Sequence, residues 1–298
     1  MIIQLKRHLG SWFAMNLTAL TTHKFPAQRV SYAARDTILY ALSVGAGVDP
    51  LNAGDLNLVY EKDLCALPSM ATVLAYPGVW INEPQFGVDY LKLLHGEQDL
   101  TVHKTLPPQA EVLGECHVTA VVDKGPGRGV LVYFSREIRA AHSRELYCTV
   151  SSTLFLRADG GCGNYGVPPA PQPAVPVVAG EKFHDQLRTT ANMALLYRLN
   201  GDLNPIHADP VIAGQAGFDR PILHGLCSYG VAGYMLVRSL CGYDPSRLRS
   251  LGVRFSAPVY PGETLSIDGT LAAGGVHFRV TALERNQVVM TNGYARVN

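Results

Sequence analysis

The feature that most restricts the fold of this chain is a run of glycine and proline near its middle. Residues 160–180 read GGCGNYGVPPAPQPAVPVVAG and carry no charged side chain. Because proline fits neither a helix interior nor a central strand, this segment is expected to act as a semi-rigid linker. The chain is therefore predicted to form two domains, residues 15–159 and 181–298, preceded by an extension at residues 1–14.

The two halves resemble degenerate copies of each other. LYALSVG at residues 39–45 resembles LYRLNG at 196–201, and LTVHKTLPPQAEV at 100–112 resembles LGVRFSAPVYPGETL at 251–265. Both pairs of segments are separated by nearly the same number of residues. Two matches in register indicate an internal duplication.

Each half is predicted to begin with an amphipathic helix. Apolar residues at helical spacing indicate this helix in both halves. They are Ala34, Ile38, Ala41 and Leu42 in the first half, and Leu187, Ala191, Ala194, Leu195 and Leu199 in the second. A longer apolar stretch at residues 222–240 predicts a helix buried against a sheet.

Strands are expected to close each half. They are placed near residues 100–104, 112–122, 129–138 and 146–156, and near 248–255, 264–271, 276–283 and 288–297. Short turns such as Gly274-Gly275 indicate hairpins between them. A helix followed by antiparallel strands, repeated once, predicts an α+β fold.

Composition argues against several functional classes. The 25 Lys and Arg nearly balance the 24 Asp and Glu, so neither nucleic acid nor an anionic membrane is an expected partner. The six cysteines form no C-x-x-C pair, which favours reduced thiols over metal or redox chemistry. No apolar run is long enough to span a bilayer, and neither a signal peptide nor a peroxisomal address is recognised. A cytoplasmic location is therefore expected.

The residues best suited to chemistry lie in the decapeptide NGDLNPIHAD, between the two second-half helices. Gly201 is expected to end the first helix, and Pro205 prevents its continuation. The resulting tight loop presents Asp202, Asn204 and His207 close together. A carboxylate, an amide and an imidazole can together hold a water molecule and move its protons.

Two other interpretations of this loop are open on spacing alone. Asp and Asn are common in turns for purely structural reasons. A metal site formed by Asp202, His207 and Asp209 is also conceivable, although their spacing matches no familiar ligand pattern. The first-half copy, DLNLVY at residues 55–60, lacks both the proline and the histidine. A loop needed only for folding should survive in both copies, so this difference favours one active site, in the second half.

The longer segment YRLNGDLNPIH, residues 197–207, resembles the signature of the hydratase 2 family, the MaoC-like (R)-specific 2-enoyl-CoA hydratases. The resemblance covers nearly the whole chain from about Tyr32, through LLHGEQ, VVDKG, RPILHGLCSYG and VRFSAPVYPGETL. It implies a double hot-dog fold, in which two tandem antiparallel sheets each wrap around a long helix. The arrangement is similar to the hydratase unit of peroxisomal multifunctional enzymes, where only the second hot-dog fold is catalytic.

The resemblance also implies a reaction and a set of roles. The chain would hydrate trans-2-enoyl-CoA to (3R)-3-hydroxyacyl-CoA in fatty acid metabolism, as a homodimer, with no metal or cofactor beyond the coenzyme A of its substrate. Asp202 and His207 would be the acid/base pair, Asn204 would help to hold the water, and the Gly225 N–H would stabilise the thioester oxygen. The residues expected to line the acyl-CoA site are His95, Gly96, Lys124 and Phe255.

Three alternatives remain beside this interpretation. One is a MaoC-like dehydratase acting on a branched, steroid-side-chain or dicarboxylic acyl-CoA. The others are a hot-dog acyl-CoA thioesterase and a non-catalytic acyl-binding module, and the intact Asp-x-Asn-Pro-x-His pattern argues against both. In the first half, PSMATVL at residues 68–74 replaces PILHGL at 221–226. We therefore also expect the first half to have lost catalysis and to have widened the acyl tunnel.

Overall fold

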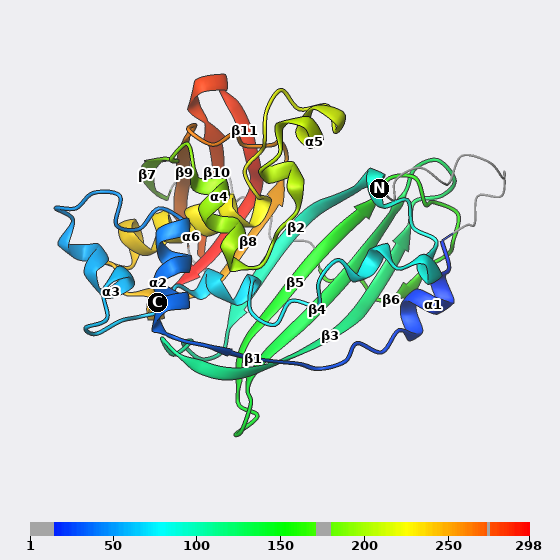
Figure 1. Cartoon of the computed structure of the whole chain (residues 1–298), viewed down its shortest axis with the longest axis horizontal. Helices are drawn as coiled ribbons and strands as arrows, with labels where there is room; N and C mark the ends of the chain where they lie inside the picture. The colour runs from blue at the N-terminus through cyan, green and yellow to red at the C-terminus, as the bar shows by residue number, and fades with distance from the viewer. Residues whose placement is uncertain (1–14, 171–179, 273–274) are drawn as a thin grey trace.

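The computed structural model describes residues 15–170, 180–272 and 275–298 (Figure 1). The expected extension at residues 1–14, the linker residues 171–179 and Gly274 of the expected hairpin turn lie outside these described residues. Within the described part, one 11-stranded sheet runs through both halves in the order β1-β3-β4-β5-β2-β8-β11-β10-β9-β7, with β6 paired to β3. The two halves are joined where β2 pairs antiparallel with β8.

The first half supplies six of these strands. They are β1 (Gln28–Tyr32), β2 (Leu93–Val102), β3 (Ala110–Asp123), β4 (Val130–Ala140), β5 (Leu146–Leu156) and β6 (Tyr165–Gly166). The helices are α1 (Leu17–Thr22), α2 (Ala34–Ser43) and α3 (Leu56–Val59), and the 3-10 helices are η1 (Ala53–Asp55), η2 (Pro68–Thr72), η3 (Trp80–Asn82), η4 (Pro84–Phe86) and η5 (Tyr90–Lys92). The helix and three of the strands predicted for this half are confirmed, whereas the strand predicted near residues 100–104 covers only the last three residues of β2.

The second half repeats a similar set of strands. They are β7 (Glu181–Arg188), β8 (Leu248–Phe255), β9 (Thr264–Ala272), β10 (Gly275–Ala282) and β11 (Gln287–Val297). The helices are α4 (Met193–Tyr197), α5 (Pro210–Gln215) and α6 (Gly225–Leu240), and the 3-10 helices are η6 (Arg198–Asn200), η7 (Pro205–His207), η8 (Pro245–Arg247) and η9 (Leu283–Arg285). The four predicted strands and the long helix are confirmed. Among the described residues, no helix is long and apolar enough to cross a membrane.

The predicted start of the second half is wrong. Leu187 lies in strand β7, where it pairs with Leu265 of β9, and the helix is confined to α4. The predicted helical face also fails, because Leu195 and Leu199 are exposed. The pairing of β7 with a strand that follows much later in the sequence overrides the local helical pattern. The second half therefore begins with strand β7, whereas in the first half helix α1 precedes strand β1.

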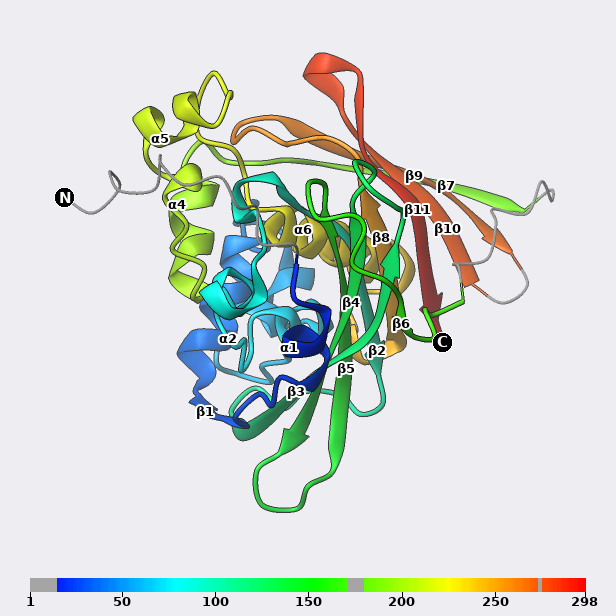
Figure 2. The same ribbon diagram turned by 90° about the vertical axis from the view of Figure 1, so that its right-hand side faces the viewer.

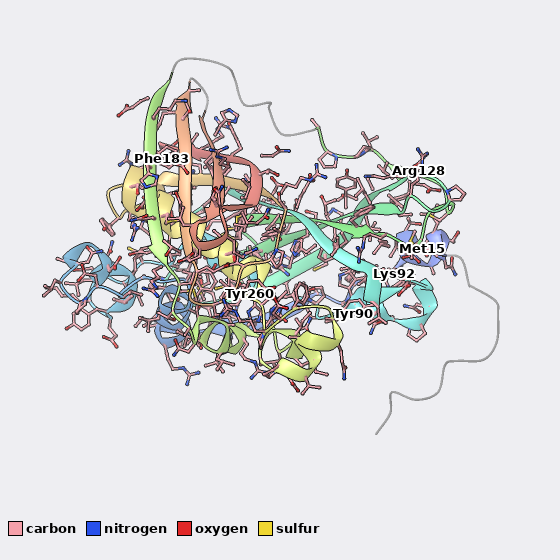
Figure 3. The ribbon with its side chains drawn as sticks, turned by 90° about the horizontal axis from the view of Figure 1, so that it is seen from above. Met15, Tyr90, Lys92, Arg128, Phe183 and Tyr260 are labelled. Atoms are coloured by element: carbon pink, nitrogen blue, oxygen red, sulfur yellow. The ribbon has the colours of Figure 1, made fainter. Side chains whose placement is uncertain are left out.

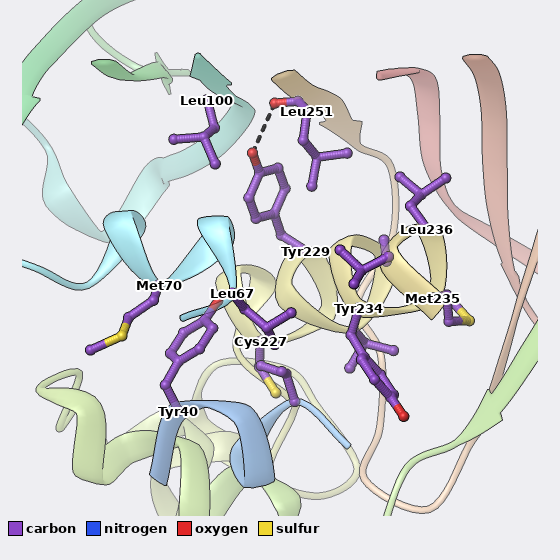
Figure 4. Packing of buried hydrophobic residues seen from close by; sticks show 14 of the residues in the cluster. Tyr40, Leu67, Met70, Leu100, Cys227, Tyr229, Tyr234, Met235, Leu236 and Leu251 are labelled. Carbon is purple, nitrogen blue, oxygen red and sulfur yellow. Dashed lines mark hydrogen bonds between the residues drawn. The ribbon is translucent and has the colours of Figure 1, made fainter. Parts of the chain in front are cut away.

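Helix α6 lies at the centre of the main hydrophobic core (Figures 2 and 4). Eleven of its residues, from Cys227 to Val237, are buried. Tyr229 donates its hydroxyl to the Leu251 carbonyl of β8 at 2.8 Å, the dashed line in Figure 4. At Gly230 a Cβ would come within 2.6 Å of the Val44 side chain, so helix α6 and the end of α2 approach as closely as glycine allows.

The first half departs from the expectation that each sheet wraps around a long helix. Where the second half has α6, the first half has only the five-residue η2. Two features mark the early end of η2. Arg136 of β4 donates to the carbonyls of Ala71 and Thr72, and Ala75 adopts a left-handed backbone with φ +48°. One long helix therefore serves a continuous sheet.

Candidate active site

The loop between α4 and α5 is held in one conformation by its own polar side chains. Gly201 ends η6 with φ +114°, a backbone that favours glycine. Asp202 Oδ1 accepts from the Asn204 N–H at 3.2 Å, and Asn204 Oδ1 caps η7 by accepting from the Ile206 N–H at 3.2 Å. The capping oxygen of Asn204 is therefore occupied, which leaves its amide NH₂ for other partners.

His207 is buried at the end of this loop, at 8% exposure. Its Nδ1 lies 2.9 Å from the Ile222 carbonyl, which can only accept, so the proton sits on Nδ1 and Nε2 is a free acceptor. Burial lowers the pKa of His207, against opposing effects of the Ile222 carbonyl and the Asp202 charge. At neutral pH the ring is therefore uncharged and suited to accept a proton.

His224 is a member of the site that the sequence analysis did not single out. Its ring stacks on that of His207 with centroids 3.7 Å apart, and its Nε2 donates to the backbone carbonyl of Asp202 at 3.1 Å. Burial, then the neighbouring His207, lowers the pKa of His224 to about 4. Its Nδ1 is buried with no partner among the described residues. The sequence did offer a signal, because His224 directly precedes Gly225, but the sequence analysis assigned a role to the glycine alone.

Asp202, His207 and His224 form one compact group. One carboxylate oxygen of Asp202 and one ring nitrogen of each histidine lie within 4.8 Å of one another, with Asp202 exposed and both histidines buried. Such a group can hold either a water molecule or a cation. The alternative ligand Asp209 takes no part, because its carboxylate caps α5 by accepting from the Val211 N–H at 2.8 Å. A metal-free site stays a prediction.

Gly225 is the first residue of the 16-residue helix α6, and it is exposed. The first N–H groups of a helix have no acceptor within the helix and carry its positive end. A Cβ at Gly225 would lie 3.6 Å from the ring of Phe255, which in turn meets the ring of His95 at 5.1 Å between centroids. The structure thus brings Gly225, Phe255 and His95 together.

His95 and Gly96 enter the site from strand β2 of the first half. Burial lowers the pKa of His95 to about 4, although the Asp202 charge acts in the opposite direction. The register between β2 and β5 shifts from His95 to Glu97, so Gly96 occupies a bulge. A Cβ at Gly96 would lie 3.2 Å from the Thr153 carbonyl oxygen.

Lys124 is not grouped with the other predicted residues. Its Nζ lies 4.8 Å from the centre of the Phe155 ring. Phe155 pairs with Leu94 while His95 pairs with Leu154, so Phe155 and His95 face opposite sides of the sheet.

The first-half loop uses its polar groups for structure. Asp55 is buried at 2% exposure. Its carboxylate accepts from the Tyr234 hydroxyl of α6 at 2.5 Å and from the Gly47 N–H at 2.9 Å. It is therefore tied to the core and presents no free carboxylate.

Two tyrosines from the first half also approach the catalytic loop, and the sequence analysis missed both. Burial raises the pKa of Tyr76 to about 12, Arg136 opposes this, and the Asp202 charge adds to it. Burial and then Asp202 likewise raise the pKa of Tyr90. In Figure 3, Tyr90 lies where the first half meets the α4–α5 region. The site is thus lined from both halves.

Comparison with known proteins places this site in a family. Residues 30–158 match the MFE-2 hydratase 2 N-terminal domain, and residues 177–292 match the MaoC like domain. The chain is 34% identical to Enoyl-CoA hydratase 2, peroxisomal, of Arabidopsis thaliana, over 95% of each chain. The chain belongs to the MaoC-like hydratase 2 family. It is therefore a hydro-lyase.

Other members support the same assignment. This MaoC-like chain is 38% identical to 3-hydroxyacyl-thioester dehydratase Y of Mycobacterium tuberculosis, over 78% of this chain and 79% of that one. It is 36% identical to the mouse peroxisomal multifunctional enzyme type 2, but it spans only 37% of that longer protein.

Solved structures confirm the fold. A MaoC-like dehydratase from Phytophthora capsici superposes with a TM-score of 0.83 at 30% identity, covering 95% of this chain and 99% of that one. A Mycobacterium tuberculosis protein described as a double hotdog fold superposes with a TM-score of 0.58 at 15% identity, covering 92% and 96%. The double hot-dog, α+β fold expected from the resemblance is therefore confirmed.

Proposed function

We propose that this protein hydrates trans-2-enoyl-CoA to (3R)-3-hydroxyacyl-CoA. The observation that carries the proposal is the group formed by Asp202, His207 and His224, which each bring one oxygen or nitrogen atom within 4.8 Å of the others, beside the N-terminus of α6. The names of the Arabidopsis and Mycobacterium tuberculosis relatives support an acyl thioester as the substrate.

The proposed reaction adds one water molecule across the C2–C3 double bond. The water binds between the Asp202 carboxylate and His207 Nε2, and the Asn204 amide donates to it. The water oxygen forms a bond with C3, one proton passes to the Asp202–His207 pair, and the pair returns one proton to C2. No other atoms enter or leave, and no metal or additional cofactor is proposed.

Negative charge develops on the thioester oxygen as C3 is attacked. We assign the Gly225 N–H as its donor, because it is exposed, lacks a helical acceptor and lies at the positive end of α6. One such donor contributes roughly 3 kcal/mol to the transition state in other oxyanion holes. His95 and Phe255 line the approach to this point.

The test is a spectrophotometric assay with crotonyl-CoA and a trans-2-decenoyl-CoA, followed by chiral analysis of the product. We expect loss of the enoyl absorbance and formation of the (3R) isomer alone. A (3S) product would contradict the stereochemistry. Release of free coenzyme A thiol without hydration would instead support a thioesterase.

Two further properties are proposed without a direct structural observation. We expect a homodimer, which analytical ultracentrifugation of the purified chain would test, a single monomer boundary counting against it. We also expect a cytoplasmic location, which imaging of the tagged full-length protein in its own cells would check.

A further inference from the structure

The loop that carries Asp202 is exposed and packs little against the rest of the chain. Residues 201–205 are all exposed, Leu203 at 60%, and a Cβ at Gly201 would meet no atom within 4 Å. The hydrogen bonds accepted by the side chains of Asp202 and Asn204 come from N–H groups of the same loop. An exposed segment with few packing contacts opens at a low free-energy cost unless another group holds it.

His224 supplies the hydrogen bond that attaches this loop to the core. Its Nε2 donates to the backbone carbonyl of Asp202 at 3.1 Å. Among the described residues, this is the only hydrogen bond that joins residues 201–206 to a segment beyond 198–209. His224 is 1% exposed and is the N-cap of α6, so the loop is attached to the helix at the centre of the main core.

The same imidazole ring also supports His207. The two rings stack with centroids 3.7 Å apart and an interplanar angle of 27°. The Ile222 carbonyl holds His207 in the plane of its ring, at 2.9 Å from Nδ1, and the stacked ring of His224 restricts tilting out of that plane. A third ring, that of Tyr197 in α4, meets His224 at 5.0 Å between centroids. His224 therefore contacts both members of the proposed acid/base pair.

The hydrogen bonding of His224 leaves it unsuited to proton transfer. A carbonyl only accepts, so the proton of the neutral ring is on Nε2 and is committed to Asp202. A second proton on Nδ1 would be buried without an acceptor among the described residues. The ionisable groups that face the ring are His207, Asp202 and Arg198. Burial and then His207 lower the pKa of His224, Asp202 opposes them, and Arg198 adds to the lowering.

We propose that His224 is a positioning residue, which holds Asp202 and His207 in a fixed geometry relative to the Gly225 N–H. His224 directly precedes Gly225, so one residue connects the proposed oxyanion donor to both members of the acid/base pair. Without it the substrate would still bind, but the water and the double bond would be misaligned. A displacement of about 1 Å at a reacting centre can lower the rate roughly 100-fold. This inference rests on the hydratase function proposed above and adds a residue to its machinery.

The first test separates the hydrogen bond from the stacked ring. In His224→Gln the side-chain NH₂ can reach the position of Nε2, in His224→Phe the ring remains without a donor, and His224→Leu has neither. We expect His224→Leu to lower kcat by about 10- to 100-fold while KM changes by less than about threefold, because the groups that bind substrate are retained. His224→Gln should recover most of the lost kcat and His224→Phe less of it, because the hydrogen bond holds the exposed loop of Asp202.

His277→Leu is the matched control. His277 is also a buried histidine of the second half, at 6% exposure, and its ring meets that of Tyr294 at 5.1 Å between centroids. This variant should keep the kcat of the unaltered chain. Folded His224→Leu with an unchanged kcat would overturn the inference, and so would a loss confined to KM. His224→Gln that is no more active than His224→Leu would also overturn it, because the hydrogen bond to Asp202 would then have no effect.

One measurement needs no variant and applies even if the His224 variants fail to fold. Nitrogen-15 NMR of the unaltered protein with labelled histidines reports which ring nitrogen carries the proton. The stacked pair is recognised by the nuclear Overhauser effect between its two rings. At neutral pH we expect His207 to be protonated on Nδ1 and His224 on Nε2. His224 protonated on Nδ1 alone could not donate to the Asp202 carbonyl and would overturn the inference.

The same NMR measurement separates this inference from the proposed function. Failure of the unaltered chain to hydrate any enoyl-CoA, crotonyl-CoA included, would refute the proposed function. The protonation of the two rings does not depend on turnover, so it decides the role of the His224–Asp202 hydrogen bond in either case.

Discussion

At the residue scale, the two histidines divide the tasks of the site between them. His207 keeps Nε2 free because Nδ1 is committed to the Ile222 carbonyl. His224 fixes the backbone of Asp202 and covers the face of the His207 ring. The base is thus kept neutral and in one orientation, which favours proton transfer without a large reorganisation.

The first prediction concerns the acid/base pair. Asp202→Ala and His207→Ala should each lower kcat by at least ~100-fold, because each removes a group that positions or deprotonates the water. Steady-state kinetics and thermal melts of each variant would measure this. Asp209→Ala is the control in the same loop, and it should lose about 1 kcal/mol of stability as a helix cap while remaining active. Near-normal turnover in both site variants would contradict the assignment.

The second prediction concerns pH. Burial holds the pKa values of His95 and His224 at about 4 in the folded chain, below the usual value near 6.5. Between these values the unfolded chain binds more protons, so the free energy of unfolding should decrease as pH falls from about 6.5 to about 4. Urea unfolding across this range would measure it, and His95→Gln should flatten the slope. Stability that stays constant over the whole range would show that these histidines are not buried as neutral rings.

At the element scale, the middle of α6 serves the fold and its first residue serves the site. Its middle packs against α2 and β8, while its first residue opens towards the site. The helix therefore fixes the position of the proposed oxyanion donor through core packing, and not through the loop that precedes it. This division can be tested with two glycines on one helix.

The third prediction uses that matched pair. Gly230→Ala should destabilise the fold by about 1–3 kcal/mol, because its Cβ would lie 2.6 Å from Val44 and 2.8 Å from the Tyr40 hydroxyl. Gly225→Ala should leave the stability of the fold intact, because the new Cβ would come no closer than 3.6 Å to its nearest neighbour, the Phe255 ring. It should lower kcat/KM, because the added methyl group narrows the site. Thermal melts of both variants would measure the change in stability, and steady-state kinetics would measure the change in kcat/KM. The reverse outcome would be an inactive Gly230→Ala and a Gly225→Ala with unchanged kcat/KM. It would mean that the roles of these two glycines are assigned incorrectly.

At the scale of the whole molecule, the second half does not form the site alone. His95 and Tyr76 come from the first half, and the sheet is continuous through β2 and β8. In the first half the five-residue η2 stands where the second half has the long helix α6. We propose that the first half gave up catalysis and widened the tunnel.

The fourth prediction follows from that widening. Each buried methylene contributes about 0.8 kcal/mol, so kcat/KM should rise with chain length from four carbons towards ten. A series of straight-chain 2-enoyl-CoAs would measure it. A clear optimum at four carbons, with no turnover at ten, would exclude a widened tunnel.

The fifth prediction is that activity is independent of metal ions. Asp202, His207 and His224 could ligate a cation, yet the proposed chemistry needs only their proton-transfer groups. Overnight dialysis against a chelator should leave kcat unchanged. Loss of activity that a divalent ion restores would require a different mechanism.

Local sequence patterns determined much of this protein. Alternating and helical spacings located eight strands, α2 and α6, and the Gly201–Pro205 loop predicted the proximity of Asp202 to His207. These features depend on residues that are close in the sequence, so a single sequence is enough to predict them. The duplication likewise followed from similarity within the chain.

Only the tertiary structure decided the rest, because it depends on which distant segments pair and in what register. Pairing with β9 made residues 181–188 a strand, and the packing of α6 beside the loop stacked His224 on His207. Strand register placed Phe155, which Lys124 contacts, on the face opposite His95, and it buried Arg136 of β4. No local pattern encodes these contacts, since each joins side chains that are far apart in the sequence.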